Sequence, residues 1–267
     1  MDWNKIISEE ISASQGADLK YFKSKKEALQ FALSCVDLTT LEGSDTDEKV
    51  RQLCQKAISV RPHTAAVCVY PVFAKLAKQI LNAYDVHVAC VAGGFPAGQI
   101  PLESKLTEVN YAVAQGADEI DMVISRGKFL EGKLEEVAEE IRAIKACCKD
   151  KILKVILETG ELQTSENIYQ AAMLAMENGA DFIKTSTGKI AVNSTPEAFI
   201  VMLYAIRDYK KKTGKCISIK PAGGISDPDT TLLYIKLIEN ILGKEWLNNQ
   251  RFRIGASRLV DRLLPEI

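Results

Sequence analysis

NGADFIKTS, residues 178–186, decides the fold because it joins the end of a helix to a short buried strand. Gly179 suits the left-handed residue that ends many helices, and the apolar run after Asp181 has the length of a strand. QGADEID, residues 115–121, repeats the pattern. The repeat predicts units in which a helix leads into a strand, and it places Asp121 and Lys184 at equivalent depths, facing each other.

Outward from this junction, short apolar runs recur along the whole chain. Their length and their content of β-branched residues are typical of buried parallel strands. The eight runs are residues 33–40, 64–71, 86–94, 119–125, 152–160, 181–186, 216–224 and 251–257.

Helical patterns separate these strands. Residues 72–84 and 134–148 each place their apolar side chains on one face of a helix. Two further helix starts are indicated by a capping residue followed by proline at the first helical position, in Thr195-Pro196 and Asp227-Pro228. The alternation predicts a single (β/α)8 TIM barrel over residues 31–267, preceded by a helical extension in residues 1–30 at the base of the barrel. A doubly wound open sheet is the alternative, but no GxGxxG follows the first strand.

The composition excludes several classes of protein. Of the 267 residues, 47% are hydrophobic and 26% are charged, and the formal net charge is −1, which gives no electrostatic footprint for nucleic acid or an anionic membrane. The first ten residues lack the basic and apolar regions of a signal peptide, and no stretch has the length of a transmembrane helix. We therefore expect a cytoplasmic protein with no nucleic-acid or membrane partner.

Cysteine and histidine give no sign of a metal site. The seven cysteines form no CxxC pair, and an odd number of them in apolar runs is typical of reduced thiols in a cytosolic protein. The two histidines, His63 and His87, lie far apart without the spacing of metal ligands. We expect no metal.

Charged residues inside the predicted strands indicate a catalytic site. Asp37, Asp121, Lys154, Lys184 and Lys220 lie toward the carboxyl ends of their strands, where TIM barrels place their active sites. Any one of these residues is more often an ion-pair partner or a side chain that reaches solvent, because an unpaired buried charge is costly. Five charged residues near the carboxyl ends of five predicted strands, four of them consecutive, favour a catalytic site.

Two lysines have the spacing needed for amine chemistry. Lys184 and Lys220 are one βα unit apart, so we expect them on adjacent strands, about 4.8 Å apart. A lysine must be neutral to attack a carbonyl, which takes a pKa shift of roughly 3 units from the usual value near 10.4. Burial and a neighbouring ammonium group both produce this shift. A carboxylate such as Asp121 can shuttle the protons, or it can simply neutralise a lysine.

Three loops after the last predicted strands are suited to phosphate. They are residues 185–189, 222–224 and 255–257, which offer backbone N–H groups, hydroxyls and Lys189. This end of a barrel often binds phosphate. Cys68 ends the second strand, where a lone cysteine is usually core, although it is also placed to line the pocket.

At this point the sequence resembles the deoxyribose-phosphate aldolases, a family of class I aldolases with a barrel fold. The matching segments follow the family's order from about residue 33 to residue 258, and the pair KTSTG and KPAGG is highly specific. The segments are DLTTL (37–41), AAVCVYP (65–71), GADEIDMV (116–123), LKVILETG (153–160), FIKTSTGK (182–189), IKPAGG (219–224) and GAS (255–257).

The resemblance implies reversible cleavage of 2-deoxy-D-ribose 5-phosphate to D-glyceraldehyde 3-phosphate and acetaldehyde, with no metal or organic cofactor. Lys184 would form the Schiff base, Lys220 would lower the pKa of Lys184, and Asp121 would be the acid/base. Further residues would contact the substrate: Asp37, Thr39, Cys68, Lys154, Thr187 and Lys189 around the sugar, and Gly188, Gly223, Gly224, Gly255 and Ser257 around the phosphate. Family members commonly form homodimers.

Two departures from the family's pattern affect the site. Arg258 stands where related members often have a second serine, so it either pairs with the phosphate or turns outward. The chain also ends in LPEI, without the terminal tyrosine that reaches the site in some members.

Two other functions remain open. One is a Schiff-base barrel aldolase with a different donor, such as a ketose phosphate. The other is a non-catalytic sugar-phosphate binder, which has no need of two neighbouring buried lysines and an aspartate.

Overall fold

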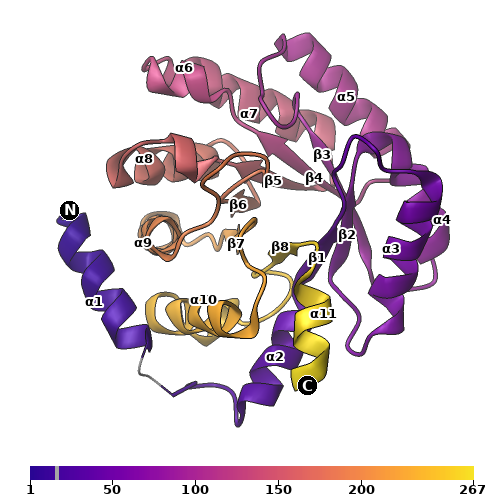
Figure 1. Cartoon of the computed structure of the whole chain (residues 1–267). Helices are drawn as coiled ribbons and strands as arrows, with labels where there is room; N and C mark the ends of the chain where they lie inside the picture. Colours follow the sequence, from indigo (N-terminus) through magenta and orange to yellow (C-terminus); the bar gives the residue numbers. More distant parts are fainter. Residues whose placement is uncertain (16–17) are drawn as a thin grey trace.

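Eight parallel strands surrounded by helices make up the computed structural model, which describes residues 1–15 and 18–267 (Figure 1). Each predicted strand is present, but each is shorter than its apolar run. The strands are β1 Val36–Thr39, β2 Ala66–Val69, β3 His87–Ala92, β4 Glu119–Val123, β5 Ile152–Ile156, β6 Phe182–Lys184, β7 Ser218–Lys220 and β8 Ile254–Ala256.

The strands form a TIM barrel, as predicted. Their order is β7-β6-β5-β4-β3-β2-β1-β8, so each strand pairs with its neighbours in sequence and β1 pairs with β8. Isolated bridges from Ile219 to Phe252 and from Ala222 to Gly255 close the gap between β7 and β8. This rules out the open doubly wound sheet.

The helices lie outside the strands in the alternation that the sequence predicts. Residues 134–148 form one helix, whereas the helical pattern of residues 72–84 begins with a 3-10 turn, η1 (Pro71–Phe73). The helices are α1 Trp3–Gln15, α2 Lys25–Ser34, α3 Asp47–Ser59, α4 Ala74–Leu81, α5 Leu102–Ala114, α6 Arg126–Leu130, α7 Leu134–Cys148, α8 Ser165–Glu177, α9 Pro196–Thr213, α10 Pro228–Ile241 and α11 Leu259–Leu263. Further 3-10 turns are η2 Thr159–Glu161, η3 Lys244–Trp246 and η4 Leu264–Glu266.

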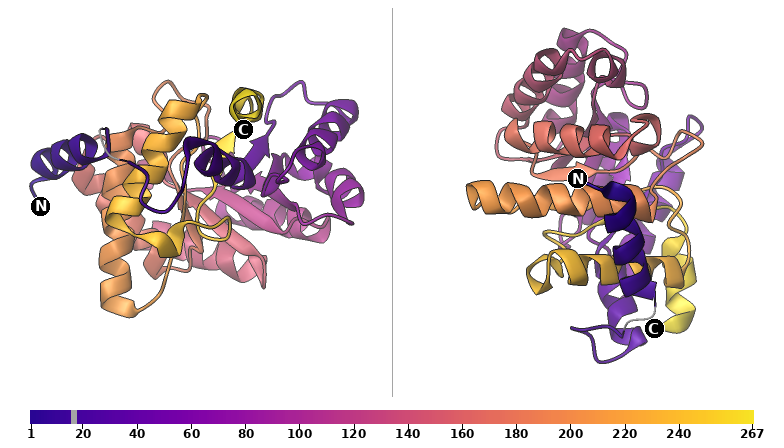
Figure 2. Two further views of the ribbon diagram at one scale, coloured as in Figure 1. Left: turned by 90° about the horizontal axis from the view of Figure 1, so that it is seen from below. Right: turned by 90° about the vertical axis from the view of Figure 1, so that its left-hand side faces the viewer.

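The first two helices precede the barrel, but they do not occupy its base as the sequence suggested. Helix α1 packs on the outside of α9 and α10, where Trp3 lies between Tyr169 and Tyr204 (Figure 2). Helix α2 packs against α10 and α11 and runs on to Ser34, so residue 30 falls inside a helix.

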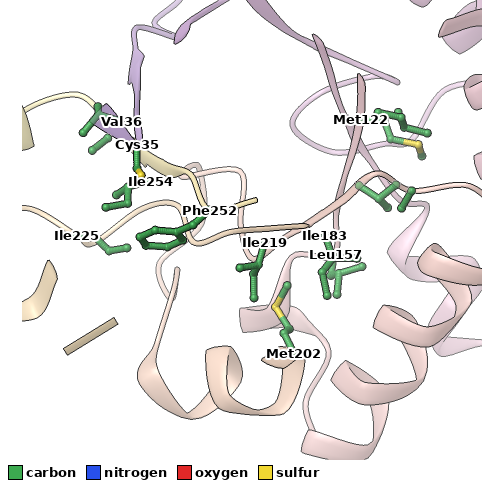
Figure 3. Close-up of a cluster of buried hydrophobic side chains, with 14 of the residues drawn as sticks. Cys35, Val36, Met122, Leu157, Ile183, Met202, Ile219, Ile225, Phe252 and Ile254 are labelled. Atoms are coloured by element: carbon green, nitrogen blue, oxygen red, sulfur yellow. The ribbon is translucent and has the colours of Figure 1, made fainter. Parts of the chain in front are cut away.

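Most of the apolar core lies between the strands and the helices. Figure 3 shows Ile219 of β7 pointing toward Met202 of α9, with Ile183 and Leu157 beside them. Inside the barrel the apolar cluster is small, consisting of Leu41, Cys68, Ala89 and Val91 with Tyr70 and Phe95 at its edge. Phe182 of β6 also lies inside the barrel, with its ring centroid 6.0 Å from Lys154 Nζ, and charged groups take much of the remaining interior.

No helix within the described ranges combines the length and the apolar character needed to cross a membrane. The seven cysteines, all of which lie in these ranges, have free thiols.

Replacing Met202 tests the packing between α9 and the sheet. Met202 is fully buried, so Met202→Ala leaves a cavity and should lower the free energy of unfolding by about 2–5 kcal/mol. Met202→Leu keeps the volume and should cost less than about 1.5 kcal/mol. Urea denaturation measures both, and equal costs for the two variants would contradict this account of the core.

Candidate active site

A carboxylate shared between lysines forms the centre of the barrel interior. Asp121 Oδ2 lies 2.8 Å from Lys184 Nζ and 2.8 Å from Lys220 Nζ. Lys184 is directly opposite Lys220 in the pairing of β6 with β7. Both geometric predictions, that Asp121 and Lys184 face each other and that the two lysines are neighbours, are confirmed.

Lys154 connects this group to a second set of charges. Its Nζ lies 2.7 Å from Asp121 Oδ1, 2.5 Å from Glu119 Oε2 and 3.3 Å from Asp37 Oδ2. Asp37 also pairs with Lys220, at 2.5 Å. The side chains of all these residues are fully buried, so the pairs lie in a region of low dielectric constant where Coulomb attraction is strong.

Arg253 and His87 complete the network. Arg253 donates to Asp37 Oδ1 at 2.7 Å and to Glu119 Oε1 at 2.9 Å, and His87 Nδ1 lies 2.7 Å from the same Glu119 oxygen. His87 begins β3, so this end of the network lies at the amino-terminal side of the sheet. The network therefore spans the barrel from one end to the other.

Apart from His87 at the amino-terminal side, the charges of this network balance when Lys184 is neutral. Three carboxylates, Asp37, Glu119 and Asp121, lie among three other cations, Lys154, Lys220 and Arg253. A protonated Lys184 would add an uncompensated positive charge in a site where burial penalises charge.

The pKa directions agree with this balance. Burial lowers the pKa of Lys184, which Asp121 partly opposes and the ammonium of Lys220 reinforces. Burial also disfavours charge on Lys220 and Lys154, but neighbouring carboxylates outweigh it and raise both pKa values. Burial would raise the pKa of Asp121, yet three lysines hold it well below its usual range. Lys184 is therefore the lysine of this group that is poised to lose its proton.

Lys184 also reaches solvent through a cavity of about 630 Å³ at the carboxyl ends of the strands. The lysine is only 3% exposed. Nine of the predicted site residues line the cavity: Thr39, Lys184, Thr187, Gly188, Lys189, Gly223, Gly224, Gly255 and Ser257. The three loops predicted to suit phosphate therefore meet around one space.

Other predicted site residues lie below this cavity. Asp121 contacts Lys184, and Lys220 is the partner of Lys184 in the pairing of β6 with β7. Neither residue lines the cavity. Asp37 and Lys154, which we expected to contact substrate, are fully buried, because ion pairs occupy their charged atoms. Cys68 is fully buried in the apolar cluster, and burial raises the pKa of its thiol.

Two cations lie at the mouth of the cavity. Lys189 Nζ is 2.9 Å from Glu42 Oε1, which joins the loop after β6 to the loop after β1. Arg258 is exposed, immediately before α11, and it also lines the cavity.

Sequence reasoning missed Glu119, Arg253 and the role of His87. Glu119 and Asp121 are two residues apart on one strand, so both point to the same face of β4. This spacing was a usable signal for Glu119. His87, which the sequence indicated only as an unsuitable metal ligand, contacts the network from the amino-terminal side of the sheet.

Replacing Lys220 tests how Lys184 is held neutral. Lys220→Met removes an ammonium that lowers the pKa of Lys184 and leaves two carboxylates less compensated, so the pKa of Lys184 should rise. The midpoint of Lys184 reactivity toward an amine-selective reagent, followed by peptide mass against pH, should move to higher pH. Lys220→Arg keeps the charge and should stay near wild type. An unchanged midpoint in Lys220→Met would contradict the coupling.

Comparison with known proteins identifies the family of the chain. The model of the DeoC/LacD family aldolase matches residues 31–235. Deoxyribose-phosphate aldolase of Homo sapiens is 46% identical over 252 residues, which are 88% of this chain and 79% of that protein. The protein of that name from Agrobacterium fabrum is 44% identical over 241 residues, which are 90% and 91% of the two chains.

Solved structures show the same fold. The structure of deoxyribose phosphate aldolase from Aeropyrum pernix has a TM-score of 0.73 at 24% identity and covers 98% of this chain and 97% of that chain. The family match over most of the chain and the identity to curated relatives lead to one conclusion. The chain belongs to the DeoC/LacD family of aldolases.

Proposed function

We propose that this protein reversibly cleaves 2-deoxy-D-ribose 5-phosphate to D-glyceraldehyde 3-phosphate and acetaldehyde through a Schiff base on Lys184. One observation carries the proposal: Lys184 lines the cavity with a lowered pKa, and it shares one oxygen of Asp121 with the ammonium of Lys220. A neutral amine in this position is the nucleophile that a class I aldolase needs. The curated relatives carry the name deoxyribose-phosphate aldolase.

The reaction begins when the amine of Lys184 attacks C1 of the open-chain sugar. The resulting carbinolamine loses water to give an iminium ion. Loss of the proton on the C3 hydroxyl then breaks the C2–C3 bond, whose electrons move into the iminium as an enamine. D-glyceraldehyde 3-phosphate leaves, the enamine is protonated at C2, and hydrolysis releases acetaldehyde and the lysine.

Asp121 and Lys220 are placed to move the protons of these steps. Both lysines contact the same oxygen of Asp121, so a proton on Lys220 is one carboxylate away from the reacting nitrogen. The carboxylate of Asp121 can therefore accept a proton at one step and return it at a later one.

The substrate phosphate would bind at the three loops. Their glycines leave backbone N–H groups accessible, and Lys189 and Arg258 supply positive charge. Gly223 and Gly224 have φ values of 77° and 81°, a conformation that side chains other than glycine rarely adopt. This end of the cavity would therefore fix the substrate with C1 toward Lys184.

We also propose a cellular location and an oligomeric state for the protein. Seven free thiols support a reducing compartment such as the cytoplasm. A homodimer is proposed from the family resemblance alone.

Trapping the intermediate tests the nucleophile. Borohydride with acetaldehyde should leave one two-carbon adduct on Lys184, located by peptide mass, and wild-type protein should release acetaldehyde from 2-deoxy-D-ribose 5-phosphate. Lys184→Leu should abolish both and still fold. An adduct on another residue would contradict the assignment of the nucleophile. A higher kcat/KM for a fructose phosphate than for 2-deoxy-D-ribose 5-phosphate would contradict the proposed substrate.

Arg258 gives a test of the phosphate end. Arg258→Ala should raise KM for 2-deoxy-D-ribose 5-phosphate about threefold at unchanged kcat, because an exposed charge contributes modestly. The kcat/KM for 2-deoxyribose, which has no phosphate, should not change. Arg262→Ala removes a nearby exposed arginine that does not line the cavity and serves as the control. Equal effects on both substrates would place Arg258 away from the phosphate.

A further inference from the structure

The turn after β5 holds the loop that follows the proposed Schiff-base lysine. Glu158 lies in this turn, and its side chain is fully buried. One carboxylate oxygen accepts from the backbone N–H of Thr187 at 3.0 Å, and the other accepts from the Thr187 hydroxyl at 2.5 Å. The carboxylate therefore fixes both the backbone and the side chain of Thr187.

The backbone of Glu158 is in the left-handed region, with φ 57° and ψ 60°. A residue with a side chain adopts this conformation at an energetic cost, so it persists only where surrounding contacts enforce it. One further contact does so here, because Thr159 N donates to Thr185 O at 2.9 Å.

Thr187 links the Glu158 carboxylate to the loop that lines the cavity. The Thr187 hydroxyl oxygen accepts from the backbone N–H of Lys189 at 3.1 Å. Thr187, Gly188 and Lys189 line the cavity, whereas Glu158 does not. Glu158 therefore acts on the cavity only through Thr187.

Few charged groups surround Glu158. Arg126 Nη1 lies 3.7 Å from its Oε2, and Arg126 Nε lies 2.5 Å from Glu161, which is partly exposed. Arg126 also donates to the carbonyl of Pro96 at 3.0 Å, so it ties the turn to the loop after β3. Arg126 partly compensates a negative charge that would otherwise lie close behind an anion-binding loop.

We propose that Glu158 is a positioning residue, which holds Thr187 and thereby fixes the loop of Gly188 and Lys189 where it borders the phosphate of the substrate. The inference rests on the proposed function for the identity of that phosphate. It predicts that losing Glu158 weakens recognition of the phosphate and leaves the chemistry at Lys184 largely intact. If Glu158 only stabilised the fold, its loss would weaken phosphate recognition and the chemistry at Lys184 together.

Glu158→Ala should raise the Kd for inorganic phosphate, measured by calorimetry, and the KM for 2-deoxy-D-ribose 5-phosphate about tenfold each. The kcat/KM for 2-deoxyribose should stay within about twofold of wild type, because no phosphate is bound. Thr187→Val should raise the Kd for phosphate as Glu158→Ala does, and Thr187→Ser, which keeps the hydroxyl, should raise it less. The double variant should be no worse than either single variant, because both remove the same interaction.

Glu161→Gln is the matched control. It neutralises the neighbouring carboxylate that also binds Arg126 but does not touch Thr187, so the Kd for phosphate should stay within about twofold of wild type. A phosphate Kd that is unchanged in Glu158→Ala, or equal losses with both sugars, would overturn the inference. If wild-type protein fails to cleave the sugar phosphate, the proposed function fails, and the phosphate Kd values still decide the role of Glu158.

Glu158→Gln adds a pH readout and serves if the alanine variant does not fold. Burial raises the pKa of Glu158, with opposing contributions from its bonds to Thr187 and from Arg126, and a reinforcing one from Glu161. Below that pKa, wild-type Glu158 loses the charged form that holds Thr187. The ratio of the phosphate Kd of Glu158→Gln to that of wild type should therefore fall toward one as the pH falls. A ratio that does not vary with pH would contradict the inference.

Discussion

The shared oxygen of Asp121 is the interaction on which the rest of the site depends. Without that carboxylate, Lys154, Lys184 and Lys220 would be three buried cations facing two acids, and the barrel interior would carry uncompensated charge. With it, the three acids match every cation except Lys184. The same carboxylate thus stabilises the fold and makes one lysine different from the others.

Most TIM barrels fill their interior with layers of branched apolar side chains. Here the apolar part is a small cluster around Cys68 together with Phe182, and buried charged side chains take much of the remaining space. Buried ion pairs of this kind contribute little net stability, because desolvation offsets their attraction. The apolar contacts between the strands and the outer helices therefore carry the stability, and the interior is free to serve the chemistry.

The sequence was sufficient to predict the barrel and the central group, because those depend on local periodicity. The repeated Gly-Ala-Asp junction placed Asp121 opposite Lys184, and one βα unit placed Lys220 beside it. The depth of Asp37 and Lys154 could not be predicted, because it depends on which carboxylates and lysines pair in three dimensions. Glu158 was out of reach for a similar reason, since its conformation is enforced by a loop about thirty residues further along.

The neutrality of the interior at rest has a consequence for the catalytic cycle. In the proposed mechanism, an iminium ion on Lys184 would add one positive charge beside groups whose charges already balance, so the covalent state would be electrostatically less favourable than the free amine. The barrel would thereby oppose accumulation of its own adduct and favour hydrolysis of the last intermediate.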